Sequence, residues 1–465
     1  MIVMKFGGSS LGDAERIHQV GSIISGKAEE EEVLVVVSAM EGITDQLETC
    51  ARLSLEGDGG REKLIEEIRS SHESVAEQLL EEGAAKAKRQ IGNKLDRLGD
   101  ICDSIATLGE LTLQTKDLIL SLGEQFSALL LSQHLKEEGH SSSSVNGSEI
   151  IVTDQRFGSA NPLMDKTKEK IRSVLPPKIR AGEIPVVTGF IAATEEGKPS
   201  TLGRGGSDYT ATLLGGLLDV DAVWIWTDVD GVKRADPDIV SNATTLPRLT
   251  YEEAAELSYF GAQVIHPKSI DPVAKNQVPL VIKNTQNPEG PDTTILNGGK
   301  SSTGLKSVTS ISDLTLITVK GHGMIGVPGI AAEVFTAVAE AEVNVLMISQ
   351  SSSEQNITFL VERRSAPKAI ESLKGTLEEE IRRSIIRDIV TEEPVSIVAA
   401  VGSGLRHQAG IDSGVFESLA RRGVNLLSIA QGSSDHNISV VVANQDERVA
   451  VQSIYEWIQS ENQQS

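Results

Sequence analysis

The last third of the chain contains an internal duplication. Residues 329–361 align without gaps on residues 410–442 at a constant offset of 81, and 15 of the 33 aligned positions are identical. Unrelated segments of this length would share about two. Each copy has the pattern of strand, helix, strand, hairpin, strand and helix, and so small a unit cannot cover both faces of its own sheet. The duplication therefore predicts two paired α+β domains of the βαββαβ type, at 308–389 and 390–465.

Residues 1–300 instead alternate short apolar runs with helix-like stretches, which predicts one α/β domain with an open, mostly parallel sheet and helices on both faces. Glycine, proline and small polar residues at 287–303 indicate a loop and a domain boundary, and Ser141–Ser144 indicate a polar loop. Helices are expected at about 13–27, 44–138 and 211–218. Strands are expected at Ile2–Phe6, Val33–Val37, Glu149–Thr153, Ile184–Val187, Ala222–Trp226 and Pro279–Ile282.

Charge and hydropathy exclude some classes of partner. The chain has 66 acidic and 43 basic residues, a formal net charge of -23, which disfavours nucleic acid and anionic membranes. No run approaches the ~18 apolar residues of a membrane span, and no basic segment leads into an apolar run at Met1. The two cysteines, Cys50 and Cys102, are expected to be reduced thiols. We therefore expect a cytoplasmic protein.

The segment from Lys5 to Ser10, Lys-Phe-Gly-Gly-Ser-Ser, stands where the first strand ends. Glycines at such a turn let backbone N–H groups approach phosphate oxygens, and a preceding lysine supplies a mobile positive charge. An ordinary tight turn also explains two adjacent glycines, so this motif alone does not decide the function.

The segment from Thr201 to Thr210, Thr-Leu-Gly-Arg-Gly-Gly-Ser-Asp-Tyr-Thr, is more specific. Arg204 suits bidentate capture of a carboxylate, and Ser207 and Asp208 can orient an amine or a hydroxyl. A loop that only turned the chain would not need these three side chains together.

Two further carboxylate positions are ambiguous by themselves. Thr227 and Asp228 follow the predicted strand 222–226, at the strand end where α/β sheets bind ligands, although a polar turn gives the same pattern. Glu124 lies in helical sequence, where a glutamate is usually a solvated surface group.

Together these motifs, with Val37-Ser38-Ala39, Gly42-Ile43-Thr44 and Gly123-Glu124, resemble those of aspartate kinases in the amino acid kinase superfamily, in order and spacing. The duplication resembles the tandem ACT domains that follow the kinase domain in that family. The resemblance covers essentially the whole chain. It implies a monofunctional, feedback-regulated enzyme that phosphorylates the aspartate side-chain carboxylate to 4-phospho-L-aspartate, the first step of lysine, threonine and methionine biosynthesis.

The resemblance also implies roles for individual residues. Lys5 and Asp208 would be catalytic, ATP would be the co-substrate, and Mg²⁺ would bridge its phosphates, with no side chain assigned as a resident metal ligand. Aspartate would be bound by Ser38, Thr44, Glu124, Arg204 and Ser207, and the nucleotide by Lys5, Gly7, Gly8, Ser9, Thr227, Asp228 and Lys233.

Two positions depart from the family pattern. Asp238 and Gln263 stand where cations that help to bind ATP are usual. We hypothesise that Lys233, Arg234 or Lys268 supplies the missing charge. The alternatives are a catalytically weak, amino-acid-sensing paralogue, or an amino acid kinase with another acceptor such as acetylglutamate.

The hairpins of the two repeats resemble those of threonine-sensitive aspartate kinases. Gln350, Asn356, Gln431 and Asn437 are the candidate effector residues, with threonine favoured as the effector and lysine second. Asn and Ser that merely form hairpins are the alternative. Because ACT domains usually assemble across subunits, a homodimer or larger homo-oligomer is expected.

Overall fold

The computed structural model describes residues 1–261, 265–298, 304–350, 355–405, 408–431 and 435–462. The chain forms two compact units. The N-terminal unit comprises 1–232, 245–255 and the described part of 263–299, and the C-terminal unit comprises the rest, including 233–244 and the described part of 256–262. The domain limits 1–300, 308–389 and 390–465 stay predictions, since short segments before residue 300 belong to the second unit.

An eight-stranded sheet forms the centre of the N-terminal unit, and its order is β3-β5-β2-β1-β8-β10-β11-β9. Every pairing is parallel except that of β10 with β11. The two central strands β1 and β2 consist of buried residues throughout, as their unbroken apolar sequences require. The strands are β1 (Ile2–Phe6), β2 (Val33–Val37), β3 (Ser142–Val145), β5 (Ile184–Thr188), β8 (Ala222–Thr227), β9 (Arg248–Leu249), β10 (Leu280–Asn284) and β11 (Thr293–Ile295).

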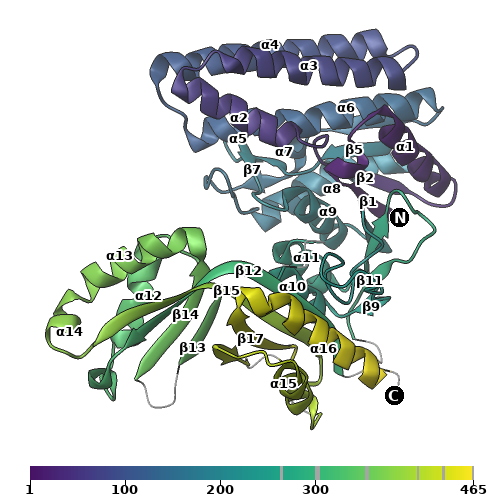
Figure 1. Ribbon diagram of the computed structural model, residues 1–465. Coiled ribbons are helices and arrows are strands. Elements are labelled where there is room, and N and C mark those ends of the chain that lie inside the picture. Colours follow the sequence, from purple (N-terminus) through teal and green to yellow (C-terminus); the bar gives the residue numbers. More distant parts are fainter. Residues whose placement is uncertain (262–264, 299–303, 351–354, 406–407, 432–434, 463–465) are drawn as a thin grey trace. The chain divides into compact units, whose positions relative to one another are not determined.

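Helices cover both faces of this sheet (Figure 1). On one face α1 (Ala14–Ala28) and α6 (Leu122–Glu137) contact the sheet and each other, and a further layer of helices lies over them. On the other face α8 (Met164–Arg180) and α9 (Gly206–Leu217) contact the strands. The other elements of this unit are α2 (Ile43–Glu56), α3 (Gly60–Leu79), α4 (Ala84–Leu108), α5 (Leu113–Leu120), α7 (Gly147–Ile150), α11 (Asp271–Asn276), and the small sheet of β4 (Val152–Thr153), β6 (Ile191–Thr194) and β7 (Pro199–Thr201); α10 (Tyr251–Tyr259) extends into both units.

The predicted α/β fold is confirmed, with local errors. Ser141–Ser144, predicted as a loop, contains the edge strand β3, because Ser142 Oγ donates to the Ile184 carbonyl (2.8 Å) and a one-sided strand needs no apolar run. Of the predicted strand Glu149–Thr153, Glu149 and Ile150 instead end α7, whose N-terminus is a capping box between Asn146 and Glu149, and only Val152 and Thr153 form a strand, β4. The predicted loop 287–303 contains β11.

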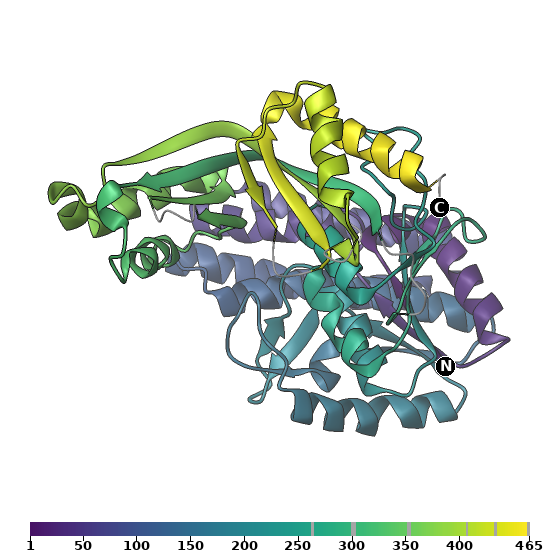
Figure 2. The same ribbon diagram turned by 90° about the horizontal axis from the view of Figure 1, so that it is seen from below.

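The C-terminal unit is built on one six-stranded sheet of order β13-β14-β12-β15-β17-β16. Its two middle strands are unusually long and run through both repeats, as Figure 2 shows. The strands are β12 (Gly304–Lys320), β13 (Met347–Gln350), β14 (Asn356–Glu362), β15 (Asp388–Ser403), β16 (Ser428–Ala430) and β17 (Asn437–Ala443); the helices are α12 (Ile330–Glu340), α13 (Ala366–Thr376), α14 (Glu378–Arg382), α15 (Ile411–Arg421) and α16 (Glu447–Asn462).

The register of β12 shows how the repeats share strands. The second half of β12, from Leu314 to Lys320, pairs with β14 of the first repeat. Both halves of β12 also pair with β15, and the part of β15 that pairs with the first half continues into the pairing with β17 of the second repeat. The two repeats therefore share the long strands β12 and β15, and each repeat's part of the sheet contains a segment of both. The predicted α+β character of the repeats is confirmed.

In the part of the chain that the structure describes, no helix has both the length and the apolar character needed to cross a bilayer.

Candidate active site

A cleft of about 990 Å³ opens in the N-terminal unit. Its lining comes from the chain turns that follow β1, β2, β4, β5 and β7, together with parts of α2, α5, α6 and α9. Lys5 and Arg204 both line it, so the two glycine turns found in the sequence share one cavity. The predicted site residues in its lining are Lys5, Gly8, Ser9, Ser38, Thr44, Glu124, Arg204, Ser207 and Asp208.

The first glycine turn fits closely against the turn that follows β2. Residues Gly8–Ser10 form a short 3₁₀ turn at the end of β1. A Cβ atom at Gly8 would lie 3.0 Å from the Ala39 carbonyl oxygen, so a side chain there would push the two turns apart. Glycine at this position therefore brings Ser38 and Ala39 to the same cavity as Lys5.

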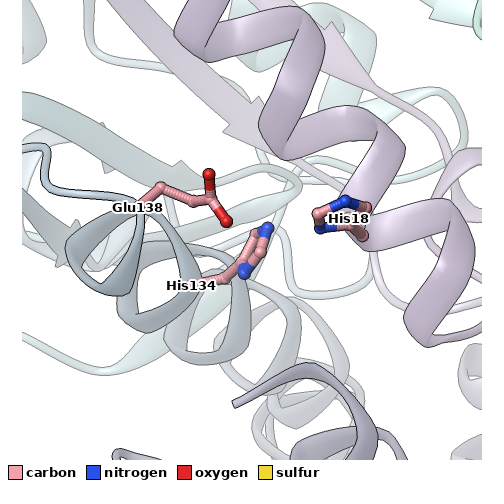
Figure 3. Close-up of side chains that lie close together, drawn as sticks. All are labelled: His18, His134 and Glu138. Carbon is pink, nitrogen blue, oxygen red and sulfur yellow. The ribbon is translucent and has the colours of Figure 1, made fainter. Parts of the chain in front are cut away.

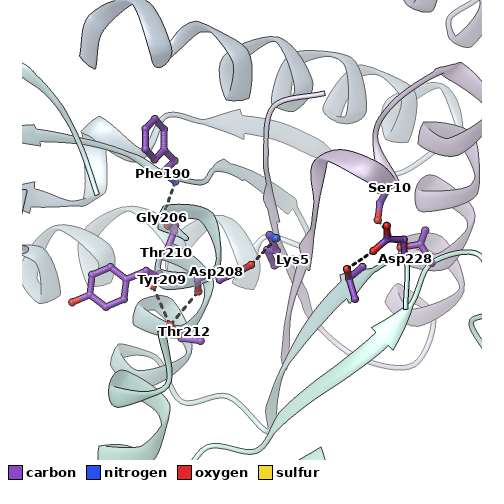
Figure 4. Close-up of polar contacts among 11 residues, drawn as sticks. Lys5, Ser10, Phe190, Gly206, Asp208, Tyr209, Thr210, Thr212 and Asp228 are labelled. Carbon is purple, nitrogen blue, oxygen red and sulfur yellow. Dashed lines mark hydrogen bonds and ion pairs between the residues drawn. The ribbon is translucent and has the colours of Figure 1, made fainter. Parts of the chain in front are cut away.

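Lys5 is paired inside the cleft with the predicted catalytic carboxylate. Its Nζ lies 2.6 Å from Asp208 Oδ1, and the two side chains are only 10% and 15% exposed (Figure 4). Asp208 lies in the first turn of α9, after the left-handed Gly205. Arg204 is exposed and makes no hydrogen bond or ion pair with any described residue, so its guanidinium is available to a ligand, whereas Lys5 is paired within the cleft.

Glu124 is not the solvated surface group that helical sequence usually implies. Its residue is 4% exposed, and Oε2 has no hydrogen-bond partner among the described residues. A Cβ at the preceding Gly123 would lie 2.6 Å from Ala39 Cβ, so this glycine allows α6 to approach the turn after β2. Burial raises the pKa of the Glu124 carboxyl to about 7, although backbone hydrogen bonds and the charge of Lys5 oppose the shift.

The remaining residues predicted to bind the nucleotide do not line the cleft; these are Gly7, Thr227, Asp228 and Lys233. Gly7 donates its N–H to the Trp226 carbonyl (3.2 Å), which places the first glycine turn beside the end of β8. There the Thr227 hydroxyl donates to the Asp228 carboxylate (3.0 Å). Lys233 belongs to the C-terminal unit, where its carbonyl accepts a hydrogen bond from Ser307 Oγ (3.3 Å).

The positions that depart from the family pattern are only partly described. Gln263 lies outside the described residues. Arg234 donates to the Lys306 carbonyl (3.0 Å), and burial lowers the pKa of its guanidinium. Because Arg234 is hydrogen-bonded to β12, it is not a freely available replacement for the cations that the family usually has for binding ATP. Lys268 Nζ lies 6.0 Å from the centre of the Tyr209 ring.

Sequence reasoning missed Asp117, which lines the cleft and is 1% exposed. Its carboxylate accepts hydrogen bonds from the Gly158 N–H (2.9 Å), the Thr201 N–H (3.1 Å) and the Thr201 hydroxyl (2.7 Å). Burial raises the pKa of Asp117 against these contacts. Asp117 therefore fixes the start of the Arg204 loop to α5, and nothing in the sequence around it distinguishes it from an exposed helical aspartate.

Replacing Asp117 by alanine is expected to lower the unfolding free energy of the N-terminal unit by about 3 kcal/mol, because buried donors lose their acceptor. Asp117→Asn keeps an acceptor oxygen and should lose clearly less. Urea unfolding followed by tryptophan fluorescence measures both. Equal losses in the two variants would show that the hydrogen bonds to Thr201 and Gly158 do not support the loop.

Phe190 was also missed, although it follows β5 where ligands usually bind. It lines the cleft with φ of 64°, a left-handed conformation that is costly for a bulky residue. Its N–H donates to Thr210 Oγ1 (3.1 Å) and its carbonyl accepts from the Leu202 N–H (2.9 Å). The start of α9 and the Arg204 loop thus hold this strained residue in place (Figure 4).

The candidate effector residues lie at strand ends in the C-terminal unit. Gln350 ends β13 and Asn356 begins β14, and residues 351–354 of the hairpin between them lie outside the described residues. Gln431 donates to Asp412 (3.3 Å), and Asn437 donates to Glu256.

Comparison with protein families matches most of the chain. The model of the amino acid kinase family matches residues 1–284, and that of the ACT domain matches 317–377 and 398–457. Bifunctional aspartokinase/homoserine dehydrogenase 2 of Zea mays is 35% identical over 96% of this chain and 49% of its own length. The chain thus spans about half the length of the bifunctional curated relatives it matches. Aspartokinase 3 of Arabidopsis thaliana is 33% identical over 96% of this chain and 79% of its own length.

Solved structures agree with this assignment. Aspartokinase III of E. coli in complex with aspartate and ADP (R-state) superposes with a TM-score of 0.83 at 28% identity, over 98% of this chain and 99% of that one. The same enzyme with lysine and aspartate (T-state) gives 0.79 at 29% identity over the same shares. The chain therefore belongs to the amino acid kinase family, among the aspartokinases that carry ACT domains.

Proposed function

We propose that the chain transfers the γ-phosphoryl group of ATP to the side-chain carboxylate of aspartate, giving 4-phospho-L-aspartate and ADP. The single observation that carries the proposal is the cleft in which Lys5, Arg204, Glu124 and Asp208 converge. A dicarboxylic amino acid presents two anions and one ammonium group, and these side chains complement all three. The related aspartokinase III holds aspartate and ADP, which supports the same pair of ligands here.

The proposed reaction needs alignment and charge neutralisation more than proton transfer. A carboxylate is already ionised at pH 7, so one oxygen attacks the γ-phosphorus while the bond to the β-phosphate oxygen breaks. Arg204 grips a carboxylate of aspartate, and Ser38, Thr44 and Ser207 offer hydroxyls to it. Glu124 and Asp208 face its ammonium group.

Lys5 is placed to neutralise the transferring group, since the incoming phosphoryl group can take it over from Asp208. Backbone N–H groups of Gly8 and Ser9 would hold phosphate oxygens, while the Gly7 N–H, which donates to the Trp226 carbonyl, would fix the turn beside them; Thr227, Asp228 and Lys233 are proposed beside the nucleotide. Mg²⁺, bound with ATP, would supply further charge neutralisation.

A coupled assay of ADP release tests this proposal. Purified chain with Mg·ATP should release ADP when aspartate is added and should form a hydroxylamine-trappable acyl phosphate. Glutamate and acetylglutamate should give far lower rates. Turnover only with another acceptor would replace aspartate as the substrate, and no turnover with any acceptor would favour the alternative of a catalytically weak sensing paralogue.

We further propose that the C-terminal unit binds a feedback amino acid, with threonine favoured over lysine. The effector residues would be Gln350, Asn356, Gln431 and Asn437, because amide side chains at strand ends can satisfy a small zwitterion with a hydroxyl. Lysine is bound by the related aspartokinase III, so it is the second candidate. Threonine is expected to inhibit, and Gln431→Ala to weaken that inhibition; inhibition by lysine alone would overturn the choice of threonine.

The same unit is proposed to mediate self-association. Strands β13 and β16 contact each other, and Ile348 and Ile429 on them are 52% and 44% exposed, so the two side chains offer apolar surface that a second copy can cover. Light scattering should therefore give at least twice the mass of 49.6 kDa.

A further inference from the structure

Three potential metal-binding side chains converge on α1 and the end of α6, outside the cleft. His18 lies on α1, His134 on α6, and Glu138 caps the C-terminus of α6. One ligand atom from each lies within 4.8 Å of the other two. Figure 3 shows the three side chains turned toward a common point. None of the sequence motifs pointed to a metal site. Residues 18 and 134 are far apart along the chain, so the sequence alone did not reveal this group.

His134 is the most informative of the three because its side chain is buried and one of its ring nitrogens lacks a hydrogen-bond partner. It is 3% exposed, and its Nε2 has no hydrogen-bond partner among the described residues. A Cβ at Gly21 of α1 would lie 2.7 Å from this Nε2, so the glycine leaves room for the ring. A buried ring nitrogen without a partner is costly unless something binds it.

We propose that His18, His134 and Glu138 form a binding site for one divalent transition-metal ion of the zinc class. His134 and Glu138 are four residues apart, so they project from the same side of the helix end, and His18 completes the set from the adjacent helix. Two imidazoles and one carboxylate suit Zn²⁺, whereas Mg²⁺ and Ca²⁺ prefer oxygen ligands only.

The site is accessible and leaves a position for water. A hollow of about 710 Å³ is lined by all three side chains and by the carboxylates Glu77, Glu81 and Glu82. These carboxylates do not belong to the proposed metal ligands, but their negative charge attracts cations toward His18, His134 and Glu138. A solvent molecule from the hollow would supply the fourth ligand of a tetrahedral ion.

The bound ion would join the two helices that follow substrate-binding segments. α1 begins at Ala14, shortly after the glycine turn at 7–10, and Glu124 lies in the first turn of α6. Ten residues separate Glu124 from His134, which is about 15 Å along a helix, so the ion lies apart from the reacting groups. Its role is to hold α1 against α6, and this does not depend on which acceptor the cleft uses.

Titration of the tag-free, metal-stripped full chain tests the site. Calorimetry with ZnCl₂ should give one equivalent bound, Co²⁺ should give the visible absorption of a tetrahedral site, and Zn²⁺ should raise the thermal midpoint. His18 and Glu138 are exposed, so His18→Ala and Glu138→Gln should fold. Each should weaken Zn²⁺ binding on the order of 100-fold and abolish the thermal shift.

Two matched variants control for nonspecific binding. His140→Ala removes a histidine two residues beyond Glu138, and Glu82→Gln removes an acid that lines the hollow but not the ligand set. Both should keep the one-equivalent isotherm. Equal loss in His140→Ala and His18→Ala, or no binding by the unmodified chain at micromolar Zn²⁺, would overturn the proposal.

Discussion

Replacement of Lys5 by methionine is expected to lower kcat for phosphoryl transfer by about 10²- to 10³-fold. Methionine keeps most of the side-chain volume and removes only the charge. In the proposed reaction this charge is most valuable in the transition state, where negative charge spreads over the transferring oxygens. Because aspartate is gripped mainly through Arg204, its KM should change far less than kcat. Steady-state kinetics with varied aspartate and saturating Mg·ATP separates the two parameters.

The matched control is Lys116→Met. Lys116 also lines the cleft, but its ammonium group pairs with Glu48 and has no part in the proposed reaction. Its kcat should stay within about threefold of that of the unmodified chain. A comparable fall in both variants, or a kcat for Lys5→Met within tenfold of normal, would remove Lys5 from the chemical step.

The central sheet and the cleft could be predicted because their signals are local. Continuous apolar runs such as Val33–Val37 indicate strands buried on both faces, and the carboxyl ends of neighbouring parallel strands meet at one edge. Lys5 lies near the carboxyl end of β1 and Ser38 directly follows the adjacent strand β2, so their proximity follows from the pattern. Arg204 could be added because its loop combines glycines with three polar side chains of complementary chemistry.

The sequence-based predictions failed where contacts between distant segments, and not the local sequence pattern, determine the structure. The serines of β3 look like a loop, but an edge strand needs only one partner and its hydroxyls bond to that partner. The sequence around Asp117 is typical of an exposed acid on a helix, but in the fold its carboxylate is buried and accepts hydrogen bonds from the Gly158 and Thr201 N–H groups. Neither partner lies near these residues in the sequence, so no periodicity or motif could have identified the contacts.

The duplication predicted two similar domains but not how they share strands. Identity between the repeats covers the helix and hairpin region, whereas the exchange involves β12 and β15, which lie outside the aligned segments. Long antiparallel strands can pair with either repeat at similar cost, and the choice depends on contacts between residues about 80 positions apart.

The buried carboxyl of Glu124 is expected to make aspartate use depend on pH near neutrality. With a pKa of about 7 in the free protein, this group is largely protonated at pH 6 and largely ionised at pH 8. Only the ionised form can pair with the substrate ammonium group. The value of kcat/KM for aspartate should therefore rise with pH and level off above about pH 8, since this parameter reports groups of the free enzyme.

The same ionisation acts on stability in the opposite direction. An unfolded glutamate ionises near pH 4.5, whereas the folded protein holds the proton until about pH 7. Between these values the folded state binds more protons, so the contribution of Glu124 to the unfolding free energy falls as pH rises and is constant above pH 7. The total loss is about 3 kcal/mol, from about 2.5 pKa units at 1.36 kcal/mol each.

Glu124→Gln tests both consequences in one variant. Its KM for aspartate should rise by about 10- to 100-fold at pH 8, because a hydrogen bond to a charged group is lost, and the inflection near pH 7 should disappear. Its stability relative to the unmodified chain should be greater at pH 8 than at pH 4. Glu41→Gln is the control, since Glu41 lines the cleft but is exposed and pairs with Arg16 (2.8 Å). If Glu124→Gln keeps the inflection, another group governs the pH profile, and the buried carboxylate does not bind the substrate ammonium.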